Sequence, residues 1–312
     1  MRYKKLGKRG PTISQIGFGA WAIGGRDWGK TDDEVSKAAL RTAIDKGITF
    51  IDTADVYGFG HSEDLIAQVI AEKGKGDIVV ATKAGNDFYN ASSKDNHGYG
   101  PICQIYTKKY LVQAAEKSIK RLKVDALDIL QLHSPDLDKL TRDDPWDALE
   151  TLKRDGKIRH AGLSIQSFKE TEQAFLLEQH HDILDCIQVR YNVLEREAEE
   201  VLFPKAMEYG IGVIVRIPLL FGLLTGKFKG TETFGEKDHR RFNLAPEKME
   251  DYLRRMNAVK PMYQKYPQAS DAQISLAFCL SHPACHTVIP GGKTPEQVRD
   301  NCGVVNWLPL SE

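Results

Sequence analysis

Four side chains capable of acid–base chemistry stand at or just beyond the ends of short apolar runs. Asp52 lies near the end of the second such run, and Tyr57 follows it in the next loop. Lys83 and His133 directly follow the third and the fourth run. Singly, each is compatible with a helix cap, a loop aromatic or a solvated surface position. Because the carboxyl ends of parallel strands gather at one face of a barrel, we expect the four to meet there.

Together these residue types are suited to reducing a carbonyl group. A phenol with a pKa of about 10 is too weak an acid at neutral pH unless a cation stabilises its phenolate. Lys83 can supply that charge, and Asp52 can hold Lys83 in place and protonated. His133, as a neutral imidazole, can orient a substrate oxygen while Tyr57 protonates the developing alkoxide. The hydride has no source among the side chains, so a nicotinamide cofactor is implied.

The elements that must position these residues are predicted to be eight parallel strands. The apolar runs are mostly continuous rather than alternating, which is typical of strands buried on both faces. The eight runs are Ile13–Gly17, Thr49–Thr53, Ile78–Thr82, Leu127–Leu132, His160–Ser164, Cys186–Val189, Ile211–Val215 and Thr287–Ile289.

Helix signals separate these runs. A capping box at Thr31–Glu34 opens a helix towards Asp45, and Thr294–Gln297 is a second box with proline at the first helical position. Further starts are predicted at Asp144-Pro145 and at Ser270. Eight strands alternating with helices predict an α/β fold, a (β/α)8 TIM barrel. An open, doubly wound sheet is the structural alternative.

Segments outside this alternation are expected at the two ends of the barrel. Tyr3–Leu6 and the turn Gly7–Pro11 predict an N-terminal β-hairpin that plugs the bottom. The connections Ala84–Tyr106 and Ile217–Pro246 are long for plain βα units and are typical of lids or binding loops at the C-terminal face. No linker marks a boundary, so residues 1–312 are predicted to form a single barrel domain.

Composition excludes several classes of protein. The 312 residues carry 43 Lys+Arg and 43 Asp+Glu, a formal net charge of zero, which argues against nucleic-acid binding and against a polybasic membrane-surface protein. The longest apolar stretch, Ile211–Leu224, is interrupted by Arg216, Pro218 and Gly222 and is too short to span a bilayer. The five cysteines form no CxxC pair, and the N-terminus lacks the apolar segment of a signal peptide. We therefore expect a cytoplasmic protein without a metal site.

A series of short motifs, in order along nearly the whole chain, resembles the aldo-keto reductase family. The motifs are Ile16–Trp21, Ile51–Gly58, Ala81–Lys83, Leu132–Pro135, Gly162–Ser164, Gln188–Asn192, Gly222–Lys227 and Ile289–Lys293 with Asn301. The resemblance implies a catalytic tetrad of Asp52, Tyr57, Lys83 and His133. It also implies a substrate pocket that includes Trp21, Tyr57 and His133. Trp28, Phe88 and Tyr89 are further candidates for this pocket.

The resemblance further implies a binding site for NADPH or NADP+. Ser164 and Gln188 match positions that bind the nicotinamide carboxamide, and the loop after the seventh strand matches the one that covers the pyrophosphate. A cation at Lys293 favours NADPH over NADH, because a 2′-phosphate needs a positive charge. The Thr294-Pro295 cap offers the N–H groups of a helix start to an anion. The full set is Gly19, Ala20, Trp21, Asp52, Ser164, Gln188, Arg216, Pro218, Leu219, Gly222, Leu224, Lys227, Gly291, Lys293, Thr294, Gln297 and Asn301.

Two positions depart from the family pattern. Ile165 follows Ser164 where an asparagine is common, which removes one polar partner of the carboxamide. Arg216 stands where many members have an aromatic ring that stacks on the nicotinamide, and a planar guanidinium can also stack. Its charge lies near a ring that becomes cationic on oxidation. We therefore hypothesise that Arg216 weakens NADP+ relative to NADPH.

Rival functions fit the sequence less well. A Schiff-base aldolase needs an unprotonated Lys83, which Asp52 opposes. A Rossmann dehydrogenase needs GxGxxG, and Gly17 and Gly19 lack the third glycine. A slow NADPH-binding redox sensor that regulates other proteins stays open, since the tetrad does not exclude it. The expected partner is a small carbonyl substrate, and the expected state is a monomer or a small homo-oligomer.

Overall fold

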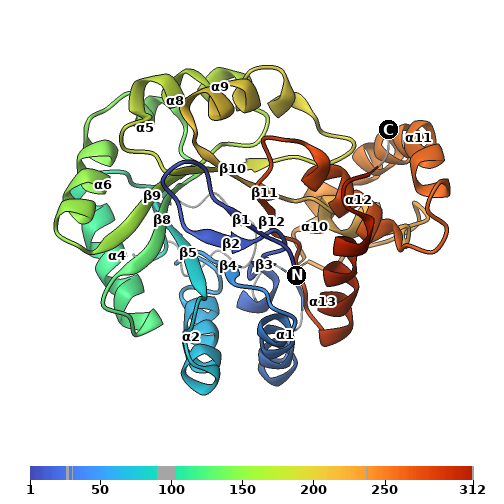
Figure 1. Ribbon diagram of the computed structural model, residues 1–312, viewed down its shortest axis with the longest axis horizontal. Coiled ribbons are helices and arrows are strands. Elements are labelled where there is room, and N and C mark those ends of the chain that lie inside the picture. The colour runs from blue at the N-terminus through green and yellow to red at the C-terminus, as the bar shows by residue number, and fades with distance from the viewer. Residues whose placement is uncertain (26–27, 30, 90–102, 237, 311–312) are drawn as a thin grey trace.

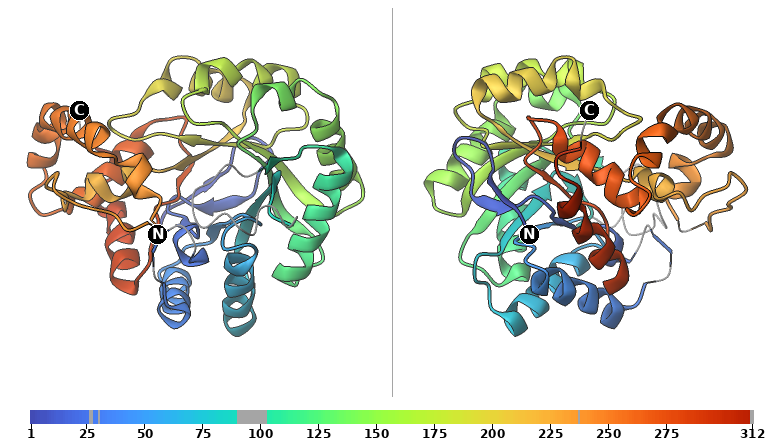
Figure 2. Two further views of the ribbon diagram at one scale, coloured as in Figure 1. Left: turned by 180° about the vertical axis from the view of Figure 1, so that it is seen from behind. Right: turned by 45° about the vertical axis from the view of Figure 1, so that its right-hand side comes forward.

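A closed ring of eight parallel strands forms the centre of the molecule in the computed structural model (Figures 1 and 2). The structure describes residues 1–25, 28–29, 31–89, 103–236 and 238–310. In spatial order the strands are β3 (Phe18–Gly19), β4 (Phe50–Asp52), β5 (Val79–Ala84), β8 (Leu127–His133), β9 (Ile158–Ser164), β10 (Cys186–Arg190), β11 (Gly212–Arg216) and β12 (Thr287–Val288).

Backbone hydrogen bonds close the ring between its first and last strands. The Gly17 N–H donates to the Val288 carbonyl at 2.8 Å, and the Gly19 N–H donates to the Pro290 carbonyl at 3.0 Å. Gly19 permits this approach, because a Cβ there would lie 2.6 Å from the Ile289 carbonyl oxygen. The closed parallel ring confirms the predicted (β/α)8 barrel and excludes the open sheet.

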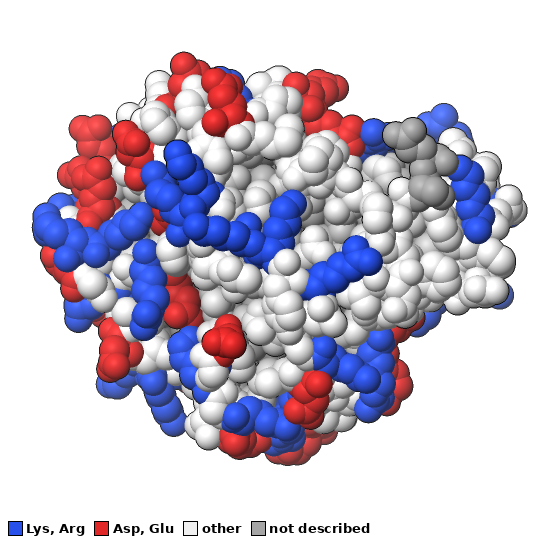
Figure 3. Space-filling model, viewed as in Figure 1, with Lys and Arg blue, Asp and Glu red and all other residues white. Residues whose placement is uncertain are grey.

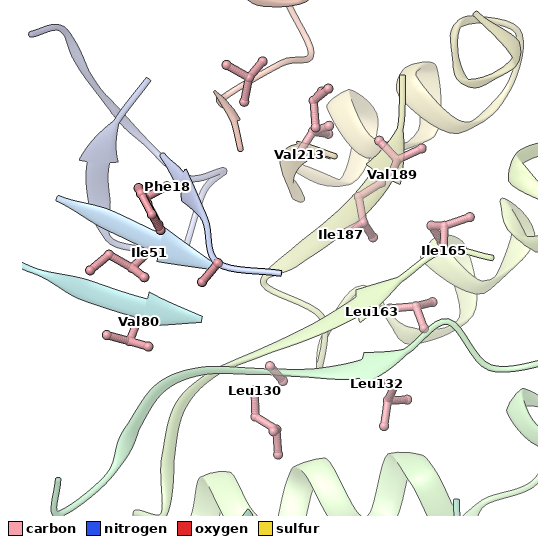
Figure 4. Close-up of a cluster of buried hydrophobic side chains, with 14 of the residues drawn as sticks. Phe18, Ile51, Val80, Leu130, Leu132, Leu163, Ile165, Ile187, Val189 and Val213 are labelled. Carbon is pink, nitrogen blue, oxygen red and sulfur yellow. The ribbon is translucent and has the colours of Figure 1, made fainter. Parts of the chain in front are cut away.

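Helices surround the ring, and most of them cover the outward faces of its strands (Figure 1). They are α1 (Asp33–Asp45), α2 (His61–Lys73), α4 (Lys108–Leu122), α5 (Leu137–Leu140), α6 (Asp144–Arg154), α7 (Glu170–Gln173), α8 (Phe175–His180), α9 (Leu202–Tyr209), α10 (Arg240–Asn243), α11 (Pro246–Gln264), α12 (Asp271–Ser281) and α13 (Pro295–Cys302). Of these, α10 and α11 lie with the second long connection. Apolar strand residues form the layer between ring and helices. Leu130 and Leu132 of β8, for example, point towards the helices below that strand (Figure 4).

The predicted helix starts are confirmed with one shift. Ser270 and Thr294 cap α12 and α13, accepting from Gln273 N at 3.2 Å and from Gln297 N at 3.4 Å. The start of α1 was predicted one residue too early: its cap is Asp32, whose carboxylate accepts from Val35 N at 3.0 Å. A carboxylate also interacts favourably with the positive end of the helix dipole.

The first predicted strand, Ile13–Gly17, is only partly right. Its start belongs to β2 (Thr12–Ser14), which pairs antiparallel with β1 (Tyr3–Lys5), whereas Ile16 and Gly17 already pair with Val288 of β12 just before β3. The Ser14 hydroxyl donates to the Ile16 carbonyl at 2.6 Å, and such a local side-chain bond turns the chain out of the strand. The other seven predicted strands agree with the structure to within two residues at each end.

The hairpin β1–β2 plugs one end of the barrel, as predicted, and lies across the centre of the ring in Figure 1. Leu6 and Ile13 are fully buried there in one cluster with interior residues of the strands. Around this face, charges of both signs are interspersed (Figure 3). Among the described residues, no helix combines the length and the apolar character that crossing a membrane requires.

The two long connections lie at the carboxyl ends of the strands. In the first, β6 (Asn86–Asp87) pairs antiparallel with β7 (Cys103–Gln104), while most of the Gly- and Asn-rich part lies outside the described residues. The second contains a 3₁₀ turn at Leu220–Thr225 and the short helix α10. These connections surround the strand ends that carry the predicted site.

Candidate active site

A buried ion pair occupies the upper part of the barrel interior. Lys83, on β5, donates from Nζ to Asp52 Oδ2 on β4 at 2.7 Å and to the Thr53 carbonyl at 2.7 Å. The two residues are only 1% and 2% exposed. Burial lowers the pKa of Lys83, and the charge of Asp52 opposes that shift. The carboxylate therefore keeps the ammonium form at this depth.

Two amide side chains fix the other oxygen of Asp52. Gln188 Nε2 on β10 donates to Oδ1 at 2.6 Å, and Gln131 Nε2 on β8 lies 3.4 Å from the same oxygen. Gln131 was not among the residues predicted from the sequence. Its signal is a single amide in the run Leu127–Leu132, in which Asp128 is the other polar residue. With these contacts, both carboxylate oxygens have partners, as a buried charge requires.

Tyr57 and His133 lie beside this ion pair, so the structure brings all four predicted tetrad residues together. Lys83 Nζ is 5.1 Å from the centre of the Tyr57 ring. The rings of Tyr57 and His133 are 5.8 Å apart and nearly perpendicular, at 80°. Lys83 and His133, expected just beyond their strands, are residues of β5 and β8 themselves.

A close approach of two glycines sets the loop that carries Tyr57. Gly58 has φ +62°, and a Cβ on it would lie 2.1 Å from the Gly24 carbonyl oxygen. The loop after β4 is thus pressed onto the 3₁₀ turn Ala22–Gly24. That contact brings Trp21 over Tyr57, with ring centres 6.0 Å apart and planes at 23°.

His133 is held as a neutral imidazole. Burial, with the charges of Lys83 and Arg216, keeps the pKa of its ring well below the usual range. Its Nδ1 is buried and has no hydrogen-bond partner among the described residues, although part of the side chain stays exposed. The Tyr106 hydroxyl donates to the His133 carbonyl at 2.7 Å and fixes the backbone. The ring is therefore suited to hydrogen bonding with a neutral oxygen.

Aromatic residues from the segment between β3 and α1 and from the second long connection form one wall beside Tyr57. His239 stacks on Trp21 at 4.3 Å and meets Trp28 edge-on, also at 4.3 Å. Burial lowers the pKa of His239 to about 3, so this ring is also neutral. A β-bridge between Trp28 and Asp238 joins the segment before α1 to the second long connection. His239 carried no recognisable signal in the sequence, since it lies far along the chain in an irregular loop.

Phe88 and Tyr89, considered for the substrate pocket, belong to a different cluster. They pack on each other at 4.0 Å, and Phe88 stacks on Phe59 at 5.2 Å. Ala54 and Val56 are the other buried members of this cluster, and Tyr57 packs against it. Phe88 is buried, so it supports the loop of Tyr57 rather than facing the wall of Trp21 and His239.

The predicted phosphate-binding residues after β12 gather at the start of α13. Lys293 Nζ donates to the Trp28 carbonyl at 2.7 Å, and its backbone N–H donates to Gln297 Oε1 at 2.8 Å. Asn301 Nδ2 donates to the Gly291 carbonyl at 3.2 Å. Burial lowers the pKa of Lys293. Lys293 thus connects this segment directly to the aromatic wall.

The loop after β11 makes an unusually tight turn next to the site. Ile217, Leu220, Phe221 and Gly222 have φ values of +56°, +43°, +57° and +97°. Such a turn exposes backbone groups that a regular helix would bond internally. Pro218 and Leu224 are buried within it, Leu219 is partly buried, and Lys227 is exposed at its far end.

The remaining predicted residues lie at the ends of β9 and β11. The hydroxyls of Ser164 and Ser134 are 3.0 Å apart. Arg216 donates from Nη2 to the Ile165 carbonyl at 2.8 Å and to Ser167 Oγ at 3.0 Å. These bonds hold the guanidinium across the end of β9. Among the described residues, His, Cys, Asp and Glu side chains form no group of three or more that could hold a metal ion.

This chain is similar to known proteins of one family. The profile of the Aldo/keto reductase family matches residues 15–312. The chain is 32% identical to aldo-keto reductase YhdN of Bacillus subtilis, over 100% of this chain and 91% of that protein. It is 31% identical to a probable voltage-gated potassium channel subunit beta of Arabidopsis thaliana, over 99% and 93% of the two chains.

Solved structures agree with these matches. The glycerol dehydrogenase AKR11B4 from Gluconobacter oxydans has a TM-score of 0.81 and 31% identity, covering 98% of this chain and 90% of that one. The holo form of aldo-keto reductase AKR11C1 from Bacillus halodurans has a TM-score of 0.78 and 26% identity, covering 100% and 93%. The family comprises oxidoreductases that act on carbonyl groups with nicotinamide cofactors. On its sequence, fold and site, this chain belongs to the aldo/keto reductase family.

Proposed function

We propose that the protein reduces aldehydes or ketones to alcohols with NADPH. The observation that carries the proposal is the buried contact of Lys83 with Asp52 beneath Tyr57, with a neutral His133 at the side. This places one potential proton donor and one oxygen-orienting group over a single fixed cation. The family membership supports the same reaction class.

Each side chain has a distinct part in the proposed reduction. His133 donates a hydrogen bond to the carbonyl oxygen and orients it. Tyr57 transfers its hydroxyl proton to that oxygen as negative charge develops. Lys83 stabilises the phenolate left on Tyr57, and Asp52 keeps Lys83 charged and fixed. The wall of Trp21, Trp28 and His239 excludes water from one side. The nicotinamide cofactor, when bound, supplies the hydride.

The donor groups at α13 support a cofactor with a phosphate on its ribose. Lys293 provides an ammonium group, and the start of α13 provides backbone N–H groups and the positive end of a helix dipole. Thr294, Gln297 and Asn301 hold this segment together. Because a 2′-hydroxyl gains little from a cation, this set favours NADPH over NADH.

Arg216 supports a preference for the reduced cofactor. Its charge acts on both His133 and Lys83, so it lies within electrostatic reach of the reacting centre. A fixed cation there disfavours a cofactor ring that gains positive charge. Replacing Arg216 with Tyr is expected to lower the ratio of NADP+ to NADPH dissociation constants. An unchanged ratio would contradict this role.

The alternative is a slow NADPH-binding regulator of another protein. The 31% identity to a probable potassium channel subunit beta favours it as the second candidate. The two functions differ in turnover rather than in fold. A reductase converts many substrate molecules per active site, whereas a regulator with bound cofactor gives about one slow conversion.

The test is NADPH consumption with 4-nitrobenzaldehyde, together with identification of the alcohol product. We expect multiple turnovers with NADPH and slower consumption with NADH at equal concentration. Tryptophan fluorescence provides a separate binding signal, because Trp21 and Trp28 line the site. Quenching by NADPH without turnover of any aldehyde or ketone would favour the regulator.

A further inference from the structure

Asp55 is a completely buried carboxyl group beside the proposed site, and the mechanism above does not use it. Its side chain is 0% exposed. Within the part of the chain that the structure describes, neither carboxyl oxygen has a hydrogen-bond partner. Its backbone N–H donates to the Lys83 carbonyl at 3.2 Å, which places it directly against the strand of the catalytic lysine.

The neighbouring buried carboxylates differ from Asp55 because each has its own cation. Asp52 pairs with Lys83 at 2.7 Å. Glu63 pairs with Arg121 at 2.5 Å and also accepts from Thr82 Oγ1 at 2.6 Å. Both nearby cations are therefore already matched by a carboxylate. An ionised Asp55 would add a negative charge without a partner cation to two carboxylate–cation pairs that are already neutral overall.

The other faces of Asp55 offer phenols and apolar side chains. The phenols of Tyr89, Tyr106 and Tyr110 lie within electrostatic reach of the Asp55 carboxyl group, and burial is the main cause of their own raised pKa values. Tyr106 gives its hydroxyl hydrogen bond to the His133 carbonyl, and Tyr110 lies 3.5 Å from Asp87.

The charged groups that act on Asp55 are therefore few. They are Glu63, which raises its pKa, and Arg121 and Lys83, which lower it; the backbone N–H of Val56 acts in the same direction as the two cations. Burial is the largest influence, and the net shift in the pKa of Asp55 is strongly upward. This direction agrees with the geometry: a buried carboxyl without a cation of its own binds a proton.

We propose that Asp55 is a positioning residue held as a neutral carboxylic acid, so that the charge of Lys83 acts on Tyr57 rather than on a second carboxylate. The role in catalysis rests on the proposed reductase function. If Asp55 were ionised, its negative charge would repel the phenolate that forms on Tyr57. It would also partly neutralise Lys83, which would then stabilise the phenolate less. Tyr57 would then be a weaker proton donor.

The neutral form has a consequence for stability that does not involve turnover. In the unfolded chain Asp55 ionises above about pH 3.9. In the folded chain it keeps its proton to higher pH, so the folded state binds more protons in that window. Its contribution to stability therefore falls as pH rises from about 4 through the raised pKa. An asparagine, which has a similar shape and cannot ionise, does not show this loss.

The first experiment is the melting temperature of Asp55→Asn and of wild type from pH 4 to pH 9. We expect the melting temperature of Asp55→Asn to increase steadily relative to that of wild type as pH rises. Glu63→Gln is the matched control, because it removes the charge of a buried carboxylate that has a partner in Arg121. It should lose stability relative to wild type at neutral pH. A difference for Asp55→Asn that does not change with pH would overturn the neutral acid.

The second experiment is the pH profile of kcat for NADPH-dependent reduction by the same two proteins. Ionisation of Asp55 should contribute to the alkaline loss of rate in wild type. The alkaline limb should therefore move to higher pH in Asp55→Asn. If both proteins turn over and the alkaline limbs of their pH profiles coincide, the catalytic role of Asp55 is overturned while the proposed reductase function stands. Absence of turnover in wild type would overturn the proposed function and this role together.

Discussion

The interior of the barrel consists of two layers that come from the same strands but differ in character. On β4, Phe50 lies in the lower layer, and Asp52, two residues later, lies in the upper one. On β5, Ala81 lies in the lower layer and Lys83 in the upper one. Residues two apart face the same side of a strand, so both members of each pair point into the barrel. The same step appears in Ile129 and Gln131, Cys186 and Gln188, and Ile214 and Arg216.

The lower layer is apolar and closed by the hairpin, whereas the upper layer is polar and joined by hydrogen bonds. Leu6 and Ile13 close the bottom of the barrel by apolar packing alone. Such packing accepts different apolar side chains of similar size but is destabilised when their volume changes. In the upper layer, Asp52 and Lys83 depend on specific partners. We therefore expect substitutions in the lower layer to change stability without activity, and substitutions of proton-transfer groups in the upper layer to change activity.

The largest effect is expected for Lys83→Met. Loss of the cation that supports Tyr57 should lower kcat by about 10²–10⁴-fold. Asp52 would also be left as a buried, uncompensated charge, which costs about 3–5 kcal/mol of stability. Steady-state kinetics and urea unfolding measure the two effects. Lys75→Met is the control: its pair with Asp128 is partly exposed, so kcat should not change.

Leu6→Ala tests the lower layer. The side chain is fully buried in the plug, so its truncation should cost about 2–5 kcal/mol of unfolding free energy. Since Leu6 belongs to no strand of the ring, the tetrad should keep its geometry. We expect kcat per folded molecule to stay within about twofold of wild type. A kcat that falls in proportion to stability would show that the two layers are not independent.

Lys293→Met tests the cofactor end of the upper face. Loss of one charge-assisted contact of about 1.5–3 kcal/mol should weaken NADPH binding by about 10–100-fold. NADH serves as the internal control, because it reports any disturbance of the Trp28 carbonyl contact. Equal losses for both cofactors, measured by fluorescence titration, would contradict a phosphate-binding role.

The smallest effect concerns pH. Because the pKa of His133 is held well below its usual range by burial and by Lys83 and Arg216, its imidazole stays neutral at pH values where an ordinary histidine is already protonated. We expect no acid limb from His133 in kcat over this range. The unfolded histidine does bind a proton below about pH 6.5, so its burial should make folding less stable as pH falls. His133→Gln should reduce that slope in thermal unfolding.

Local patterns in the sequence were sufficient to predict the ring and the meeting of the four candidate residues. Apolar runs with polar residues at their ends predicted seven strands and the meeting of Asp52, Lys83 and His133. The first strand was only partly right, because a short hydrogen bond from Ser14 turns the chain within the predicted run. The spacing of apolar residues along the chain does not reveal such a hydrogen bond.

The parts of the site that could not be predicted depend on contacts between distant segments. His239 reaches Trp21 only because two irregular connections meet above the barrel. The lack of a partner for Asp55 depends on Arg121 already being paired with Glu63. Neither of these contacts can be recognised from the spacing of residues or from the composition of the chain.

The most direct test of the account is Tyr57→Phe, which removes one oxygen from the upper layer and nothing from the lower one. The measurements are NADPH affinity, melting temperature and the single-turnover rate of aldehyde reduction, with Tyr209→Phe on α9 as the control. The account predicts a rate lowered by about 10²–10⁴-fold, unchanged NADPH affinity, and a melting temperature within about 2 °C of wild type. A rate within about twofold of wild type would contradict it.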